Sequence, residues 1–149
     1  YMLKKKLHNH CENYIRKKLK ILEKRKNELK LALDSEVKSS AGDKHETGRA
    51  MIQLEREKLG KQILENEQVL KKYISFKKTS NKENVRIGSI VITTDLNFYL
   101  SLPAGFLKND SNIFYCVSPE SPIGKLLLGK KVKDEIYFNN KTSTILEII

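Results

Sequence analysis

The chain has 149 residues, of which 32% are charged and 39% are hydrophobic, and its formal net charge at pH 7 is +11. No apolar run approaches the roughly 20 residues that a membrane-spanning helix needs, and no signal peptide is recognisable, so we expect a cytoplasmic protein without a membrane partner. The two cysteines, Cys11 and Cys116, are too few for a disulfide framework, and we expect reduced thiols.

The positive charge is concentrated in the first half of the chain. Residues 1–78 contain 21 Lys+Arg and 11 Asp+Glu, a net charge of +10, whereas residues 79–149 contain 8 and 7, a net charge of +1. A basic segment suits a polyanionic partner, most simply nucleic acid, although a solvated helical surface explains the same charge equally well.

Residues 2–78 are predicted to form an antiparallel coiled-coil hairpin. A first helix follows from apolar residues in 4-3 spacing without Gly or Pro, and a second helix repeats the pattern after a small-residue tip at 39–47. At 1.5 Å per residue, such helices make an arm of roughly 45 to 50 Å with one narrow apolar seam. The first seam contains Leu7, Cys11, Ile15, Leu19, Leu22, Leu29 and Leu33, interrupted by Lys26. The second contains Ile52, Leu59, Ile63, Leu70 and Ile74, interrupted by Arg56 and Asn66.

The polar, turn-rich residues 79–84 are predicted to link the arm to a small α+β domain at 85–149. Four or five strands are expected, with Asn139-Asn140 as a tight hairpin turn between the last two. The expected strands cover residues 85–93, 96–102, 113–117, 135–138 and 142–148. One helix is expected after Ser121, which suits an N-cap, with Gly129 just beyond its end and Ile123, Leu126 and Leu127 on its buried face.

Asp43 and Glu46 stand one helical turn apart at the arm's tip. Asp-x-x-Glu at a helix start is a capping-box pattern, in which both carboxylates bind backbone amides, and this structural role is the more frequent one. Alternatively, the two carboxylates could bind a hard cation such as Mg²⁺, with the remaining ligands supplied by a partner and water.

Other residues suggest weaker sites. His8, His10 and Cys11 resemble half a zinc site, but an amphipathic helix start explains them better, and Cys116 reads as a core residue. Basic runs on the first helix could contact RNA or DNA phosphates without base specificity. The residues chosen for this contact are Lys17, Lys18, Lys24, Arg25 and Lys26. Because no phosphate loop, nucleophile elbow or triad order is present, we expect a protein that is not an enzyme on its own.

Two segments carry a family resemblance. The tip Gly42-Asp43-Lys44-His45-Glu46 is similar to G-D-x-x-E-N, and residues 118–138, SPESPIGKLLLGKKVKDEIYF, are similar to S-P-[IL]-G-[KR]-A-L-[LI]-G-[KR]-x-x-G-D-x-V. Together with the arm and the small α+β domain, they resemble the bacterial GreA/GreB transcript-cleavage factors over nearly the whole chain.

The resemblance implies an FKBP-like C-terminal domain and a bacterial, monomeric transcription elongation factor. Its partners would be RNA polymerase, through the secondary channel, and the 3′ end of the nascent RNA. Asp43 and Glu46 would then complete the site of a second Mg²⁺ shared with the polymerase, which stimulates the polymerase's own cleavage of backtracked RNA.

Departures from the family pattern keep an alternative open. Thr47 replaces the family's Asn, Ala50 its Tyr, and Lys133 the Gly before Asp134. A non-cleaving regulator that occupies the same channel is therefore the second hypothesis. The third is a basic coiled coil that binds free RNA or DNA without a polymerase.

Overall fold

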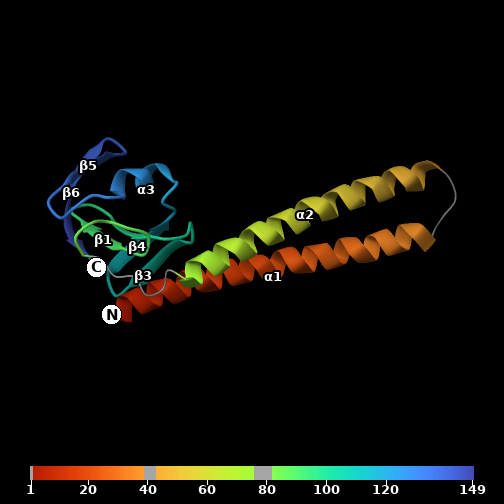
Figure 1. The fold of residues 1–149 in the computed structure, drawn as a ribbon, viewed down its shortest axis with the longest axis horizontal. Coiled ribbons are helices and arrows are strands. Elements are labelled where there is room, and N and C mark those ends of the chain that lie inside the picture. The colour runs from red at the N-terminus through yellow and green to blue at the C-terminus, as the bar shows by residue number, and fades with distance from the viewer. Residues whose placement is uncertain (1, 39–42, 76–81) are drawn as a thin grey trace. The chain divides into compact units, whose positions relative to one another are not determined.

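The computed structural model describes residues 2–38, 43–75 and 82–149, and of residues 36–38 and 43–46 it describes the helical backbone alone. Helices α1 (Met2–Lys38) and α2 (Asp43–Ser75) precede a mixed six-stranded sheet, which confirms the predicted α+β class with an N-terminal pair of long helices (Figure 1). The short helix α3 (Pro122–Leu127) lies between the fourth and fifth strands. The strands are β1 (Ile90–Thr93), β2 (Asn97–Leu100), β3 (Gly105–Asn109), β4 (Asn112–Val117), β5 (Glu135–Phe138) and β6 (Lys141–Ile148).

The chain divides into two compact units. The sheet unit comprises Tyr1–Tyr14 and Lys72–Ile149, and the hairpin unit comprises Ile15–Lys71. One end of each long helix therefore belongs to the sheet unit, because these ends pack on the sheet. The predicted linker at 79–84 lies within the sheet unit, and its residues 79–81 lie outside the described part of the chain.

In the hairpin unit the predicted seam is present on both helices. Ile15, Leu29, Leu59 and Ile63 are buried, whereas most of the helix surface is exposed. The remaining apolar seam positions of this unit are half-buried: Leu19, Leu22, Leu33, Ile52 and Leu70. A narrow stripe of this kind buries one edge of each helix and leaves the charged faces in water.

Ile74 was predicted at the seam, and this prediction is wrong. Ile74 is 43% exposed, whereas the neighbouring Tyr73 is 5% exposed. The seam steps alternately by four and three residues, so the step of four from Asn66 to Leu70 is followed by a step of three to Tyr73. Tyr73 also finds hydrogen-bond partners for its hydroxyl at this position, which an isoleucine would leave unused.

The sheet has the order β3-β4-β2-β1-β6-β5, and both of its faces are buried. Only β2 and β4 pair in parallel. Val91, Phe98 and Leu100 point to the face that packs with Ile123 and Leu127 of α3. Because successive side chains of a strand alternate between faces, Tyr99 and its cross-strand partner Cys116 point to the opposite face, where the ends of α1 and α2 pack.

Two strand predictions need correction. The strand expected at 85–93 covers only 90–93, because Gly88 adopts a φ of 94° and Val85 instead bonds the carbonyl of Lys130 at 2.8 Å. The sheet has six strands rather than four or five, since β3 was missed. Most residues of β3 are exposed, so it lacks the alternating apolar pattern on which the prediction relied.

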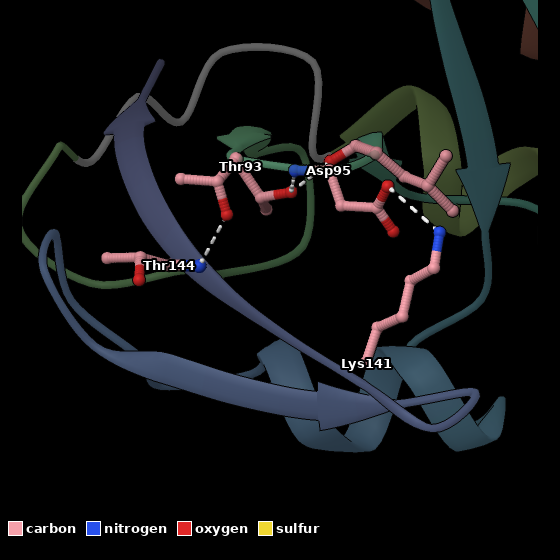
Figure 2. Close-up of polar contacts among 6 residues, drawn as sticks. Thr93, Asp95, Lys141 and Thr144 are labelled. Carbon is pink, nitrogen blue, oxygen red and sulfur yellow. Dashed lines mark hydrogen bonds and ion pairs between the residues drawn. The ribbon is translucent and has the colours of Figure 1, made fainter.

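The turn between β1 and β2 is fastened to β6 by polar contacts (Figure 2). The Thr93 hydroxyl accepts the Asp95 amide at 3.1 Å, and the Thr94 hydroxyl accepts the Thr144 amide at 3.0 Å. Lys141 Nζ lies 3.9 Å from a carboxylate oxygen of Asp95. These contacts satisfy backbone groups at the sheet margin, which indicates a structural role for this cluster.

Candidate functional site

The tip acids stand at the beginning of α2. Asp43 is its first residue, and Glu46 follows one turn later, so the helix places both residues on the same face. Their side chains lie outside the described part of the structure, as do residues 39–42 of the predicted tip. The choice between a helix cap and a cation site therefore remains a prediction about the donor set, which consists of two carboxylates.

The basic residues of α1 have different surroundings. Lys17, Lys18 and Lys24 are exposed. Arg25 donates to Glu55 of α2 at 3.0 Å and lies 3.8 Å from Glu28, so its charge already has two carboxylate partners. Lys26 is half-buried at a seam position. The three exposed lysines are thus the residues of this set that can approach a phosphate backbone without losing a contact.

The first residues of α1 form part of a buried core rather than an exposed ligand group. The His8 ring stacks on Tyr73 with centroids 4.5 Å apart, and His10 Nε2 lies 2.8 Å from the carbonyl oxygen of Ala104. Because a carbonyl accepts, that nitrogen donates its N–H and is not free to bind a metal. Among the described residues no group of three His, Cys, Asp or Glu side chains is arranged to hold a metal ion.

The same core contains both thiols and two tyrosine hydroxyls. Cys11 and Cys116 share a hydrogen bond that lowers the pKa of Cys11, while this bond and burial raise the pKa of Cys116. The hydroxyls of Tyr73 and Tyr99 lie 3.1 Å apart, and Tyr73 donates to the carbonyl of His8 at 3.2 Å. Burial raises the pKa of Tyr73 and raises that of Tyr99 to about 12. This network joins both long helices to the sheet, and the sequence analysis did not anticipate it.

The segment 118–138 begins with a capped helix. Ser121 is the N-cap of α3 and accepts the amide of Gly124 at 3.1 Å, and Gly129 follows the C-cap residue with a φ of 84°, as predicted. Leu126 was expected on the buried face, but it is 38% exposed. Gly124 is buried there in its place, and a Cβ on it would overlap the carbonyl oxygen of Ser118. The helix therefore packs against the chain through a glycine that only close approach explains.

The end of the same segment makes a tight turn. Asp134 accepts the amide of Lys131 at 2.8 Å through its side chain, and its own amide donates to the Lys131 carbonyl at 3.0 Å. Lys133 adopts a φ of 78°, a left-handed conformation that glycine tolerates far better than lysine. The turn leads directly into β5.

Comparison with known proteins adds no family assignment. A scan of protein-family models and a search of curated proteins found no match to this chain. Of the helices that the structure describes, none is both long and apolar enough to cross a membrane.

Proposed function

We propose that the chain is a transcription elongation factor of the GreA/GreB type, which binds the secondary channel of RNA polymerase and stimulates cleavage of backtracked RNA. The proposal includes an FKBP-like assignment for the sheet domain. The observation that carries it is the agreement between the motif at 118–138 and the local backbone. Two positions at which the family pattern has glycine, Gly124 and Gly129, have a close approach and a left-handed φ, respectively.

Lys133 adds independent support. The family pattern has glycine here, and the backbone of this chain is left-handed although the residue is lysine. Such a φ disfavours a side chain, so its retention is what a substituted glycine position would produce. A chance match of sequence letters would not require the unusual backbone at the one position where this chain departs from the pattern's glycines.

The tip supplies the residues for the activity. Asp43 and Glu46 are hard oxygen donors one helical turn apart, which suits a Mg²⁺ ion that takes its other ligands from the polymerase and from water. When bound, the ion would activate a water for phosphodiester hydrolysis. In this proposal the two carboxylates hold and orient, and the exposed Lys17, Lys18 and Lys24 favour the approach to RNA phosphates.

The test uses a stalled, backtracked elongation complex of the cognate polymerase with radiolabelled RNA. Adding the protein with Mg²⁺ should shorten the RNA. The double variant Asp43→Ala/Glu46→Ala should still co-purify with the polymerase but should lower the cleavage rate by about a hundredfold or more, since both added ligands are lost. The matched control Asp34→Ala/Glu67→Ala removes two exposed carboxylates elsewhere on α1 and α2 and should leave cleavage unchanged.

Cleavage by the tip variant at the wild-type rate would refute the role of Asp43 and Glu46. Failure of the wild-type protein to bind the polymerase would refute the whole proposal.

Thr47 and Ala50 favour a second candidate, a channel-binding regulator that does not stimulate cleavage. Both residues are exposed on the first turns of α2, where the family pattern has Asn and Tyr. If these two side chains are needed for the chemistry, the protein would slow nucleotide addition without shortening the RNA. Restoring Thr47→Asn and Ala50→Tyr together would then increase cleavage, whereas the first candidate expects little change.

A further inference from the structure

The hairpin unit contains one seam layer that breaks the apolar pattern on both helices. Lys26 of α1 and Arg56 of α2 occupy positions that the 4-3 spacing assigns to apolar residues, and both are half-buried. The two side chains line the same shallow hollow between the helices, with a volume of about 410 Å³. Gln53, Glu57 and Gly60 line the rest of it.

Two cations in one seam layer are electrostatically unfavourable unless an anion lies between them. The carboxylate of Glu55 bonds Arg25 at 3.0 Å instead. Among the described residues neither Lys26 nor Arg56 forms an ion pair, and the buried Nε of Arg56 has no hydrogen-bond partner. A buried donor without an acceptor is rare in a folded protein and often marks a place where a ligand is missing.

Gly60 gives a second reason to regard the hollow as a site. It lies inside α2, where glycine lowers helix stability relative to alanine. A Cβ added to Gly60 would meet nothing within 4 Å, so close packing does not require a glycine. Its missing side chain instead keeps the hollow open next to the two cations.

We propose that this hollow binds the diphosphate group of a small ligand, either inorganic pyrophosphate or the phosphate tail of a nucleotide. The planar guanidinium of Arg56 suits bidentate contact with phosphate oxygens, and Lys26 supplies a second positive charge. The Gln53 amide can donate from the same wall, while the Glu57 carboxylate opposes the anion. The site lies in the hairpin unit and does not depend on the proposed polymerase function, because every measurement below uses the protein alone.

The experiment is a calorimetric titration of the full chain with inorganic pyrophosphate at fixed ionic strength, repeated with ATP. Arg56→Gln and Lys26→Gln should each weaken binding by about tenfold or more, because each removes a charge-assisted contact. The matched control Lys17→Gln removes the same charge from an exposed position and should change affinity by less than about twofold.

Two further variants separate a built site from general attraction to a basic arm. Gly60→Leu keeps every charge and fills the hollow, so it should abolish binding while the melting temperature stays at least as high as that of the wild type. Glu57→Gln removes the opposing carboxylate and should strengthen binding by a few-fold. If Arg56→Gln lowers the melting temperature, Gly60→Leu carries the test by itself.

Several results would overturn the proposal. One is equal weakening by Lys17→Gln and Arg56→Gln, which would assign binding to net charge. Another is undiminished binding by Gly60→Leu. ATP binding that pyrophosphate does not displace would refute the assignment to the diphosphate group, whereas mutual displacement would support it.

Discussion

The sheet unit and the hairpin unit place their polar groups in opposite environments. In the sheet unit, the hydroxyls of Tyr73 and Tyr99 and both thiols are buried and joined to one another. In the hairpin unit, the ion pair between Arg25 and Glu55 lies half in water, and few residues beyond the seam are covered. The first arrangement restricts conformation, whereas the second leaves charge accessible to a partner. The difference suggests that stability resides mainly in the sheet unit and recognition in the hairpin unit.

The largest expected effect compares leucines from the two units. Leu127 of α3 is fully buried, so Leu127→Ala should lower the free energy of unfolding by about 3 kcal/mol. Leu59→Ala, in the two-helix seam, should cost about half as much, because water can reach the cavity that it leaves. Urea unfolding followed by near-ultraviolet circular dichroism would measure both changes.

Leu126→Ala is the control, because its side chain is 38% exposed on the same helix as Leu127. It should change the free energy of unfolding by less than about 1 kcal/mol. Equal losses from Leu127→Ala and Leu59→Ala would show that the two units are equally well packed and would remove the contrast.

The next effect concerns the tyrosine pair. Tyr73→Phe removes the group that bonds both Tyr99 and the His8 carbonyl, and it should cost about 1 to 2 kcal/mol because these buried partners are left unsatisfied. Tyr137→Phe, whose hydroxyl is exposed and bonds Asn140 at 3.3 Å, is the matched control and should be nearly neutral. Urea melts at neutral pH would rank the two variants, and a neutral Tyr73→Phe would mean that the network adds no net stability.

The tyrosine pair also predicts a pH dependence. Burial raises the pKa of Tyr99 from 10.0 to about 12, and raises that of Tyr73 as well. Between these pH values the unfolded chain has released protons that the native state still binds, so stability falls as pH rises. The contribution is complete below pH 10.0 and is lost toward pH 12. Unfolding at pH 9 and pH 11 should show a smaller decrease for Tyr73→Phe than for the wild type, and equal decreases would contradict the prediction.

Much of the fold could be predicted because the relevant signals are local. The long helices follow from 4-3 apolar spacing, α3 from Ser121 and Gly129, and the last hairpin from Asn139-Asn140, both of which have positive φ. The missed strand β3 has few buried side chains, so its pairing with β4 left no mark on the pattern. The sheet that covers it could not be anticipated from its own residues.

The sites were harder to predict, because their contacts join residues far apart in the sequence. Tyr73 and His8 meet across 65 positions, and no spacing rule connects them. Lys26 and Arg56 were visible as polar interruptions of the seam, but only the fold shows that they line one hollow. The tip acids are local in sequence, and their role depends on a partner that supplies the remaining ligands.

Lys133 offers a stabilising change in the sheet unit. Its φ of 78° disfavours a side chain, so Lys133→Gly should raise the free energy of unfolding by about 1 kcal/mol. Lys131→Gly, in the same turn, should be neutral or destabilising, since no left-handed φ occurs there. Thermal melts of both variants would measure the difference, and a loss of stability in Lys133→Gly would mean that the lysine side chain makes a contribution larger than the backbone strain.

The smallest effect tests the exposed ion pair of the hairpin unit. Arg25 and Glu55 are 3.0 Å apart, and about half of each side chain is exposed to water. A double-mutant cycle with Arg25→Ala and Glu55→Ala should give a coupling energy of about 0.5 kcal/mol, which decreases as salt is added. Such a weak coupling would mean that Arg25 can exchange Glu55 for a phosphate at little cost. A coupling above about 2 kcal/mol would instead make the pair a fixed brace of the helices, and it would exclude Arg25 from any role in contacting nucleic acid.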